Sequence, residues 1–282
     1  IDALLDGEKL DLIVGGPPCQ AYSIAGRSRS ENKMIGDKRN YLYRLYAEFL
    51  KKYQPKYFVF ENVLGLLSAK DEDGSLHFDN MRTLFKKCGY TTDFRILNAS
   101  DYGVLQNRKR IIIFGVRKEY FGEDAKELIN DFYKEALPKY KVNKKKTVLE
   151  AIGDLPKLYP VKEDIKINGT RTRHTLPEPK VANHIARWQS DRDVGIFKLL
   201  AEDIETGRNE YASINALKQL YTDVTGKKSN VHKYHVLKWD EPSNLIPAHL
   251  YKDGLRHIHP DSKQQRTITV REAARLQTFA DD

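Results

Sequence analysis

Short apolar runs alternate with amphipathic stretches along the first half of this chain. Residues 10–14 and 57–60 are short and apolar, so each predicts a buried strand. Between them, residues 40–53 carry apolar side chains at helical spacing, and Pro55 follows, which predicts a helix that ends there. A strand, a helix and a second strand in this order predict a right-handed crossover in a parallel sheet.

The same alternation continues toward the middle of the chain. Residues 78–88 are amphipathic and precede Gly89, which predicts a helix with a glycine C-cap. Residues 91–97 and 110–116 each predict a strand, and residues 122–137 predict a further helix. Strands that alternate with helices indicate an α/β fold.

The periodicity is weaker in the second half. Thr147 and Glu150 have the spacing of a capping box, which predicts a short helix that ends before Pro156. Residues 157–238 are polar and basic, so we expect an irregular, smaller domain that faces nucleic acid. A basic insertion without base contacts is the alternative. Residues 269–279 predict a last helix.

Composition narrows the class of protein. The chain has 282 residues, 40% of them hydrophobic, which is enough for one large domain or two unequal ones. A net charge of +9 favours a polyanionic partner, although a basic enzyme without such a partner is an alternative. Apolar runs stay well short of the roughly 18 residues that a membrane span needs, so no membrane partner is expected. The sequence begins in mid-pattern and shows no signal peptide.

The numbers and spacings of cysteine and histidine argue against disulfide bonds and against a metal site. The chain has two cysteines, Cys19 and Cys88, which argues against a disulfide framework and favours a reducing compartment such as the cytoplasm. Cys88 lies on the apolar side of its predicted helix and is expected to fill the core. The histidine pairs in the second half lack the matched spacings of a metal site, so we expect no metal.

Cys19 is the first candidate for chemistry. Two glycines and two prolines, Gly15 to Pro18, follow the first strand and force a rigid turn that displays the thiol. In an open α/β sheet, ligands and chemistry collect at the carboxyl ends of strands. From these residues alone, a nucleophile and an inert buried cysteine are both open.

The segment after Cys19 and the end of the second strand supply further candidates. Residues 20–36 are rich in Gly, Ser and Arg, which predicts a mobile loop that could close over a phosphate backbone; an ordinary solvated loop is the alternative. Glu61 ends the second strand and should share an edge with Cys19, unless it caps the next helix. Arg108 and Arg110 flank the start of a strand, where they could equally be solvated.

Four blocks of the sequence carry a resemblance to a known family. They are 15–23 (GGPPCQAYS), 61–63 (ENV), 106–110 (QNRKR) and 271–279 (REAARLQTF). In this order, and with this placement after strands and in loops, they resemble the DNA (cytosine-5)-methyltransferase family. Each block alone is a weak to moderate signal, but together they span almost the whole chain.

The resemblance implies a fold and a domain organisation. We expect a Rossmann-like sheet of the S-adenosylmethionine-dependent methyltransferase kind, with helices on both faces. Residues 1–155 would form the catalytic domain, residues 156–238 the target-recognition domain, and residues 239–282 a return to the catalytic domain.

The resemblance also implies roles for particular residues. Cys19 would attack C6 of cytosine, and a protonated Glu61 would bond the N3 and N4 edge of the base. Arg110 would stabilise charge at O2 and Arg108 would hold a flanking phosphate, although these two roles could be exchanged. No residue is a candidate for the base that removes the C5 proton, and water would serve as that base. Residues 20–36 would be a lid over bound DNA. The DNA contacts expected are Gln20, Ser23, Arg27, Arg29, Asn62 and Gln106, and the contacts to the cofactor, S-adenosyl-L-methionine, are Pro18 and Leu42.

The sequence departs from the family pattern at two places. In the family, a glycine-rich block Phe-x-Gly-x-Gly would precede residue 1 and an Asn-rich block would follow Asp282, and neither is found in this sequence. The expectation is therefore a fragment, part of a longer chain, or one half of a split enzyme, with weak or absent cofactor binding by this chain alone.

The expected partners follow from the same resemblance. They are double-stranded DNA and a cognate restriction endonuclease, with the protein a monomer or half of a split enzyme in a bacterial cytoplasm. A tRNA cytosine methyltransferase of the same family and a catalytically silent DNA-binding subunit are alternatives. A cysteine protease is a remote third, because no histidine is positioned near Cys19 by a recognisable pattern.

Overall fold

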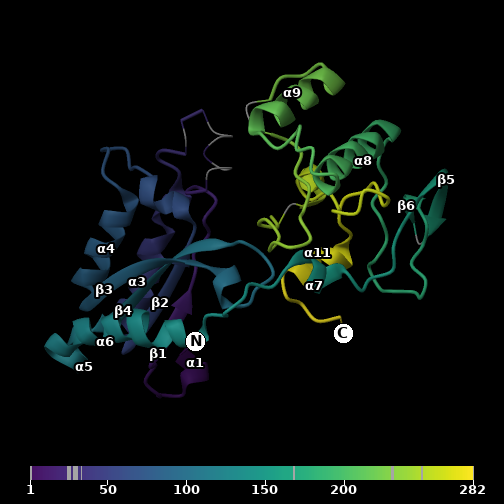
Figure 1. The fold of residues 1–282 in the computed structure, drawn as a ribbon. Coiled ribbons are helices and arrows are strands. Elements are labelled where there is room, and N and C mark those ends of the chain that lie inside the picture. Colours follow the sequence, from purple (N-terminus) through teal and green to yellow (C-terminus); the bar gives the residue numbers. More distant parts are fainter. Residues whose placement is uncertain are drawn as a thin grey trace. The chain divides into compact units, whose positions relative to one another are not determined.

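The computed structural model describes residues 2–23, 27, 31–32, 34–167, 169–229, 232–248 and 250–281 (Figure 1). Backbone contacts divide the chain into two compact units. The first unit comprises residues 1–98 and 109–141, and the second comprises residues 99–108 and 142–282. Compactness does not test function, so the functional boundaries expected at residues 155 and 238 stay a prediction.

A four-stranded sheet forms the centre of the first unit. Its order is β1 (Leu12–Gly15), β2 (Tyr57–Asn62), β4 (Lys109–Arg117) and β3 (Tyr90–Asn98). β1 and β2 are parallel, as predicted for the first crossover, whereas β4 is antiparallel to both of its neighbours. The sheet is therefore mixed.

Helices cover both faces of this sheet, as expected. Phe58 and Phe60 of β2 are fully buried in a cluster with side chains of α3 (Leu42–Tyr53) and α4 (His77–Lys87). The alternate residues Tyr57 and Val59 pack instead against the cluster of α6 (Ala125–Asp131). Because successive side chains of a strand point to opposite faces, the continuous apolar run of β2 is explained by burial on both sides.

Most predicted boundaries in the first unit are confirmed within a few residues. Gly89 adopts φ +90° after α4, as a glycine C-cap requires. Cys88 is buried, and burial raises the pKa of its thiol, which fits the predicted core role. The predicted helix over 122–137 is instead divided into shorter pieces. These are a 3-10 turn (Gly122–Asp124), α6, a π turn (Phe132–Ala136) and a 3-10 turn (Leu137–Tyr140), and the short helix α5 (Lys118–Phe121) precedes them.

The first strand differs from its prediction in burial. Leu12 is 45% exposed and Val14 is 68% exposed. Ile13 packs against the core on one face of β1, whereas Leu12 and Val14 lie on the other face, where the described α6 cluster includes no β1 side chain. The apolar run correctly indicated a strand, but the prediction of a buried one was wrong.

The second unit is more regular than predicted. Residues 157–238 contain the hairpin β5 (Pro160–Ile167) and β6 (Thr170–His174), and the helices α8 (Asp191–Glu205) and α9 (Ile214–Thr225). The sequence signal for α8 was present but not used. Ser190 caps it by accepting a hydrogen bond from the Asp193 amide, and apolar residues recur at helical spacing behind it. The description of this segment as irregular was therefore wrong.

A capping box begins each of two helices in the second unit. Thr147 with Glu150 starts α7 (Val148–Ile152), as predicted, and Thr269 with Glu272 starts α11 (Val270–Leu276). The two helices pack together around a shared apolar cluster. The remaining elements are α1 (Asp2–Leu5), α10 (Leu250–Asp253) and the 3-10 turns Lys38–Tyr41, Leu64–Ser68, Ala99–Tyr102 and Gly254–Arg256. Within the residues described, no helix combines the length and apolar character that crossing a membrane requires.

Candidate active site

Cys19 begins a tight turn just beyond β1. The amides of Tyr22 and Ser23 donate hydrogen bonds to the Cys19 carbonyl at 3.1 and 2.9 Å. The thiol is half-buried and forms no disulfide. Cys19 is thus partly exposed in the turn that the glycine and proline residues before it predicted, and its role as a nucleophile stays a prediction.

The segment before Cys19 is held against the end of β2. A Cβ atom at Gly16 would lie 2.9 Å from Glu61 Oε2 and 3.1 Å from the Glu61 carbonyl oxygen, so a larger residue here would require Glu61 to shift. The Asn62 side-chain amide donates to the Pro17 carbonyl at 3.3 Å. The expected placement of Glu61 beside the cysteine loop is therefore observed.

Glu61 forms an ion pair across the sheet. Its Oε1 lies 2.8 Å from Nε of Arg110, which stands near the start of the adjacent strand β4. The Glu61 side chain is 40% exposed, whereas that of Arg110 is 15% exposed. Glu61 is not the cap of the following turn, since the cap residue there is Val63 and makes no side-chain hydrogen bond.

Asn62 orders the local backbone. It is fully buried, its Oδ1 accepts from the Val63 amide at 2.9 Å, and its Nδ2 bonds the Pro17 carbonyl. These contacts occupy both ends of the side-chain amide. They do not support the prediction that Asn62 contacts DNA directly.

The loop after Cys19 makes contacts of its own. The exposed Gln20 accepts a hydrogen bond from Arg39 at 2.7 Å, and the Ser23 hydroxyl donates to the Gln20 carbonyl at 3.1 Å. Arg27 donates to the Ser68 hydroxyl at 3.1 Å. Arg29 lies outside the described residues, so its predicted DNA contact stays a prediction, as do those of Gln20, Ser23 and Arg27.

Gly65 is a positioning residue that sequence reasoning missed. A Cβ atom here would lie 1.9 Å from the carbonyl oxygen of Tyr22, so any side chain would push the Cys19 turn away. The usable signal was a lone glycine inside the apolar stretch 63–67.

Gln106 and Arg108 belong to the second unit. Gln106 is 4% exposed, and its side-chain oxygen accepts from the Ile246 amide at 3.3 Å. A buried side chain used in this way holds the backbone of its own unit, which argues against the predicted DNA contact. The role of Arg108 at a phosphate or at O2 stays a prediction.

The two predicted cofactor contacts are apolar. Pro18 is exposed and Leu42 is half-buried. They fit van der Waals contact with S-adenosylmethionine, but neither side chain can bond its ammonium, carboxylate or ribose hydroxyls. These two residues alone do not make a complete site for the cofactor.

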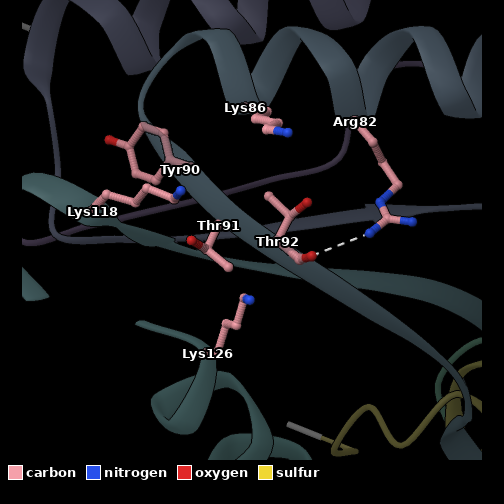
Figure 2. A pocket seen from close by; sticks show the side chains of 7 residues that line it. All are labelled: Arg82, Lys86, Tyr90, Thr91, Thr92, Lys118 and Lys126. Carbon is pink, nitrogen blue, oxygen red and sulfur yellow. Dashed lines mark hydrogen bonds between the residues drawn. The ribbon is translucent and has the colours of Figure 1, made fainter. Parts of the chain in front are cut away.

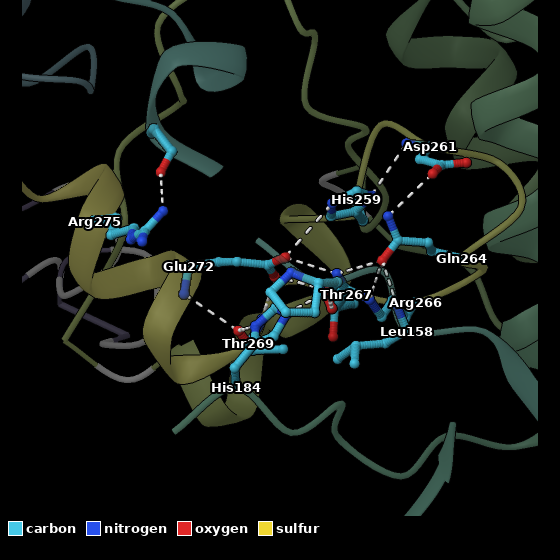
Figure 3. A network of polar contacts seen from close by, with 12 residues as sticks. Leu158, His184, His259, Asp261, Gln264, Arg266, Thr267, Thr269, Glu272 and Arg275 are labelled. Carbon is cyan, nitrogen blue, oxygen red and sulfur yellow. Dashed lines mark hydrogen bonds and ion pairs between the residues drawn. The ribbon is translucent and has the colours of Figure 1, made fainter. Parts of the chain in front are cut away.

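A second polar cluster lies inside the second unit (Figure 3). Arg266 bonds both oxygens of Glu272 at 2.7 Å, and His259 Nε2 lies 3.5 Å from Glu272. All three side chains are buried, and burial lowers the pKa of His259. The part of the chain that the structure describes contains no cluster of three or more histidine, cysteine or acidic residues that could hold a metal. We assign this cluster a structural role.

The fold and these residues together define a class of protein. A mixed sheet with helices on both faces is a Rossmann-like α/β fold, and here a half-buried cysteine lies in the loop beside a Glu–Arg pair at the ends of the strands. A solved structure described as a DNA modification methyltransferase encoded within an E. coli prophage has the same fold. It aligns with a TM-score of 0.56 and 22% identity over 99% of this chain and 72% of that one.

Sequence comparison narrows the class to a family. The C-5 cytosine-specific DNA methylase family matches residues 2–282, and this chain belongs to it. Type II methyltransferase M.Bpa9945I of Bacillus paralicheniformis is 34% identical over 97% of this chain and 63% of its own length. Type II methyltransferase M.XorII of Xanthomonas oryzae pv. oryzae is 30% identical over 96% of this chain and 60% of its own length. The chain thus spans somewhat less than two thirds of these relatives.

Proposed function

We propose that this protein methylates C5 of a cytosine in double-stranded DNA, with S-adenosyl-L-methionine as the methyl donor. The observation that carries the proposal is the ion pair between Glu61 and Arg110, with Gly16 of the cysteine loop packed directly on Glu61. Nucleophile, acid and cation candidates thereby gather at one end of the sheet. Family membership supports the same reaction.

Cys19 supplies the nucleophile. C5 of cytosine is too weakly nucleophilic to take a methyl group directly, so the Cys19 thiolate adds to C6. The new S–C6 bond breaks the C5–C6 double bond, and its electron pair makes C5 nucleophilic. The bound donor supplies an electrophilic methyl group. Loss of the C5 proton to water then restores the double bond and expels the thiolate.

Glu61 and Arg110 stabilise the base during this addition. A protonated Glu61 donates a hydrogen bond to N3 and accepts one from the N4 amino group, so that negative charge does not build up on the ring. An arginine pairs best with an ionised carboxylate. We therefore expect the entering base to draw Arg110 onto O2, which leaves Glu61 able to carry the proton.

The target base must leave the helix to reach Cys19. A thiol cannot reach C6 inside stacked duplex DNA, so the cytosine is rotated out, as enzymes that act on bases require. The basic character of the chain, with a net charge of +9, supports binding of the phosphate backbone. The residues after Cys19 act as the lid, and residues 156–238 select the target sequence.

The biological setting follows from the relatives. Their names describe type II methyltransferases, so we infer the modification enzyme of a restriction-modification system. Its partner would be a cognate restriction endonuclease, and it would act as a monomer on chromosomal DNA in a bacterial cytoplasm. A tRNA cytosine methyltransferase or a silent DNA-binding subunit is the alternative that the test below distinguishes.

Covalent trapping tests this function. The protein, with any flanking sequence its gene encodes, is mixed with S-adenosylmethionine and duplex DNA that contains 5-fluorocytosine, because fluorine cannot leave C5 as the proton does. Mass spectrometry should find a denaturation-resistant adduct on Cys19. Cys19→Ser should abolish the adduct and methylation but change DNA affinity less than about twofold. Cys88→Ser, at the buried cysteine, should keep the adduct.

The alternatives predict different results. An adduct with a fluorinated tRNA substrate but not with DNA would favour the tRNA enzyme. DNA binding without any adduct would favour the silent subunit. Full methylation by Cys19→Ser would overturn the assignment of the nucleophile.

A further inference from the structure

The first unit contains a cavity at the end of the sheet opposite Cys19. It has a volume of about 390 Å³ and is lined by residues at the beginning of β3 and beyond the end of β4. Register pairs Tyr90 with Arg117 at this end and Leu97 with Arg110 near the other end. The strand residues between the two ends correspond to roughly 25 Å. The cavity is therefore separate from the proposed active site.

Four cationic side chains line this cavity. Figure 2 shows Arg82 and Lys86 from α4, Lys118 from α5 and Lys126 from α6 around the β3 residues Thr91 and Thr92. Tyr90 completes the lining, and no carboxylate of the described residues belongs to it. Among the described residues, none of the four cations forms an ion pair. Their charges are thus not paired directly with carboxylates in this part of the chain.

Arg82 is held in place before any ligand binds. Its guanidinium carbon lies 5.8 Å from the ring centre of Phe78 and 5.9 Å from that of Phe94. Its Nη2 donates to the Thr92 carbonyl at 3.2 Å, which is the one hydrogen bond found for this side chain within the described ranges. A guanidinium carries five N–H donors, so most of them remain available. In addition, Nε is buried without a hydrogen-bond partner.

We propose that this cavity binds a small polyphosphate, such as the triphosphate group of a nucleotide. An arginine whose orientation is already set matches the fork of phosphate oxygens, and the three lysines add mobile point charges. The hydroxyls of Thr91 and Thr92 can donate to further oxygens. The volume lies within the roughly 300–1,000 Å³ of small-ligand sites.

A small polyphosphate fits these residues better than a DNA backbone does. The four cations converge on one cavity from three helices, which matches several charges on a compact group. Backbone phosphates of DNA are spread along the strand and are better matched by cations in a row. DNA bound at this cavity would also lie at the far end of the sheet from Cys19. Binding of a polyphosphate at this cavity therefore does not depend on the proposed methyl transfer at Cys19.

Titration with inorganic tripolyphosphate tests the proposal. Isothermal calorimetry of the whole protein should detect saturable binding, and Lys126→Glu and Lys86→Glu should each weaken it at least about tenfold. Lys87→Glu is the matched control, since it makes the same charge change one residue from Lys86 but does not line the cavity. It should weaken binding less than about twofold.

Further probes identify the source of the phosphate. A nucleoside triphosphate that binds as tightly as tripolyphosphate, with the same response to the variants, would support a nucleotide ligand. Inorganic phosphate should bind more weakly than either. Absence of tripolyphosphate binding at millimolar concentration, or equal weakening by Lys87→Glu, would overturn the proposal. It would also be overturned if the cavity variants weakened only the binding of duplex DNA.

Discussion

The two units each contain a close arginine–glutamate pair, but the pairs differ in exposure. Glu61 and Arg110 approach to 2.8 Å with side chains 40% and 15% exposed. Glu272 and Arg266 approach to 2.7 Å with both side chains 1% exposed. The same pair of side chains is thus partly exposed in the first unit and enclosed in the second.

Burial decides what each pair can do. Burial alone would raise the pKa of Glu272, but the charge and hydrogen bonds of Arg266 outweigh it and hold that pKa well below its usual range. Both Glu272 oxygens are used, since Oε2 also accepts from the Thr269 amide at 2.7 Å. This pair joins the segment around residue 266 to the start of α11. The Glu61 side chain, by contrast, is 40% exposed.

The largest expected effect separates activity from stability at the open pair. Glu61→Gln keeps the shape but removes the acid, so methylation should slow by about 10² to 10⁴-fold. Since the side chain is partly exposed, the free energy of unfolding should change by less than about 1 kcal/mol. Methyl-transfer kinetics and urea unfolding measure the two quantities. Unchanged kinetics would remove Glu61 from the mechanism.

The same substitution at the enclosed pair should act on stability. Glu272→Gln leaves Arg266 buried without its counter-charge, which should lower the free energy of unfolding by about 3–5 kcal/mol. Asp154→Asn is the matched control. It removes one charge from the ion pair between Asp154 and Arg275, in which the Asp154 side chain is 69% exposed. It should cost less than about 1 kcal/mol. Equal losses in urea unfolding would show that burial is not what distinguishes the pairs.

Acid should reveal a smaller effect, confined to the second unit. Burial lowers the pKa of His174 to about 4, although its hydrogen bond to the Gln264 carbonyl opposes the shift. The folded state therefore holds this histidine neutral, and its contribution is complete above the unfolded pKa near 6.5 and is lost as pH falls toward 4. Between pH 7 and pH 5, His174 alone should account for about 2 kcal/mol.

Comparison with His174→Gln isolates that contribution. The stability of this variant, measured by urea unfolding at a series of pH values, should fall less steeply than that of the natural protein over this interval. An identical slope would mean that His174 is protonated in the folded state.

Local patterns were sufficient for much of the first unit. The apolar run of β2 and the spacing along α3 and α4 predicted these elements, because burial on a sheet or along one helix face imposes a characteristic period. Turn chemistry placed Cys19 after the first strand, since two glycines and two prolines permit little else. The same reasoning undervalued α8, whose cap and apolar spacing lie in a polar, basic segment.

Contacts between distant residues could not be predicted in this way. The pairing of Glu61 with Arg110 depends on the antiparallel register of β2 and β4, and the burial of Gln106 depends on the segment around residue 246. The exposure of Leu12 and Val14 likewise depends on which helices pack on each face of the sheet. None of these features produces a hydrophobic pattern in the segment where it occurs.

Local sequence patterns identified the candidate residues Cys19, Glu61 and Arg110, because these residues occur in recognisable blocks at the ends of strands. The exposure of their charges could be learned only from the folded chain. Glu61 is partly exposed beside Arg110, Glu272 is enclosed against Arg266, and Arg82, Lys86, Lys118 and Lys126 line one cavity. Exposure and local electrostatics arise from residues far apart in sequence, whereas strands, helices and caps arise from neighbours.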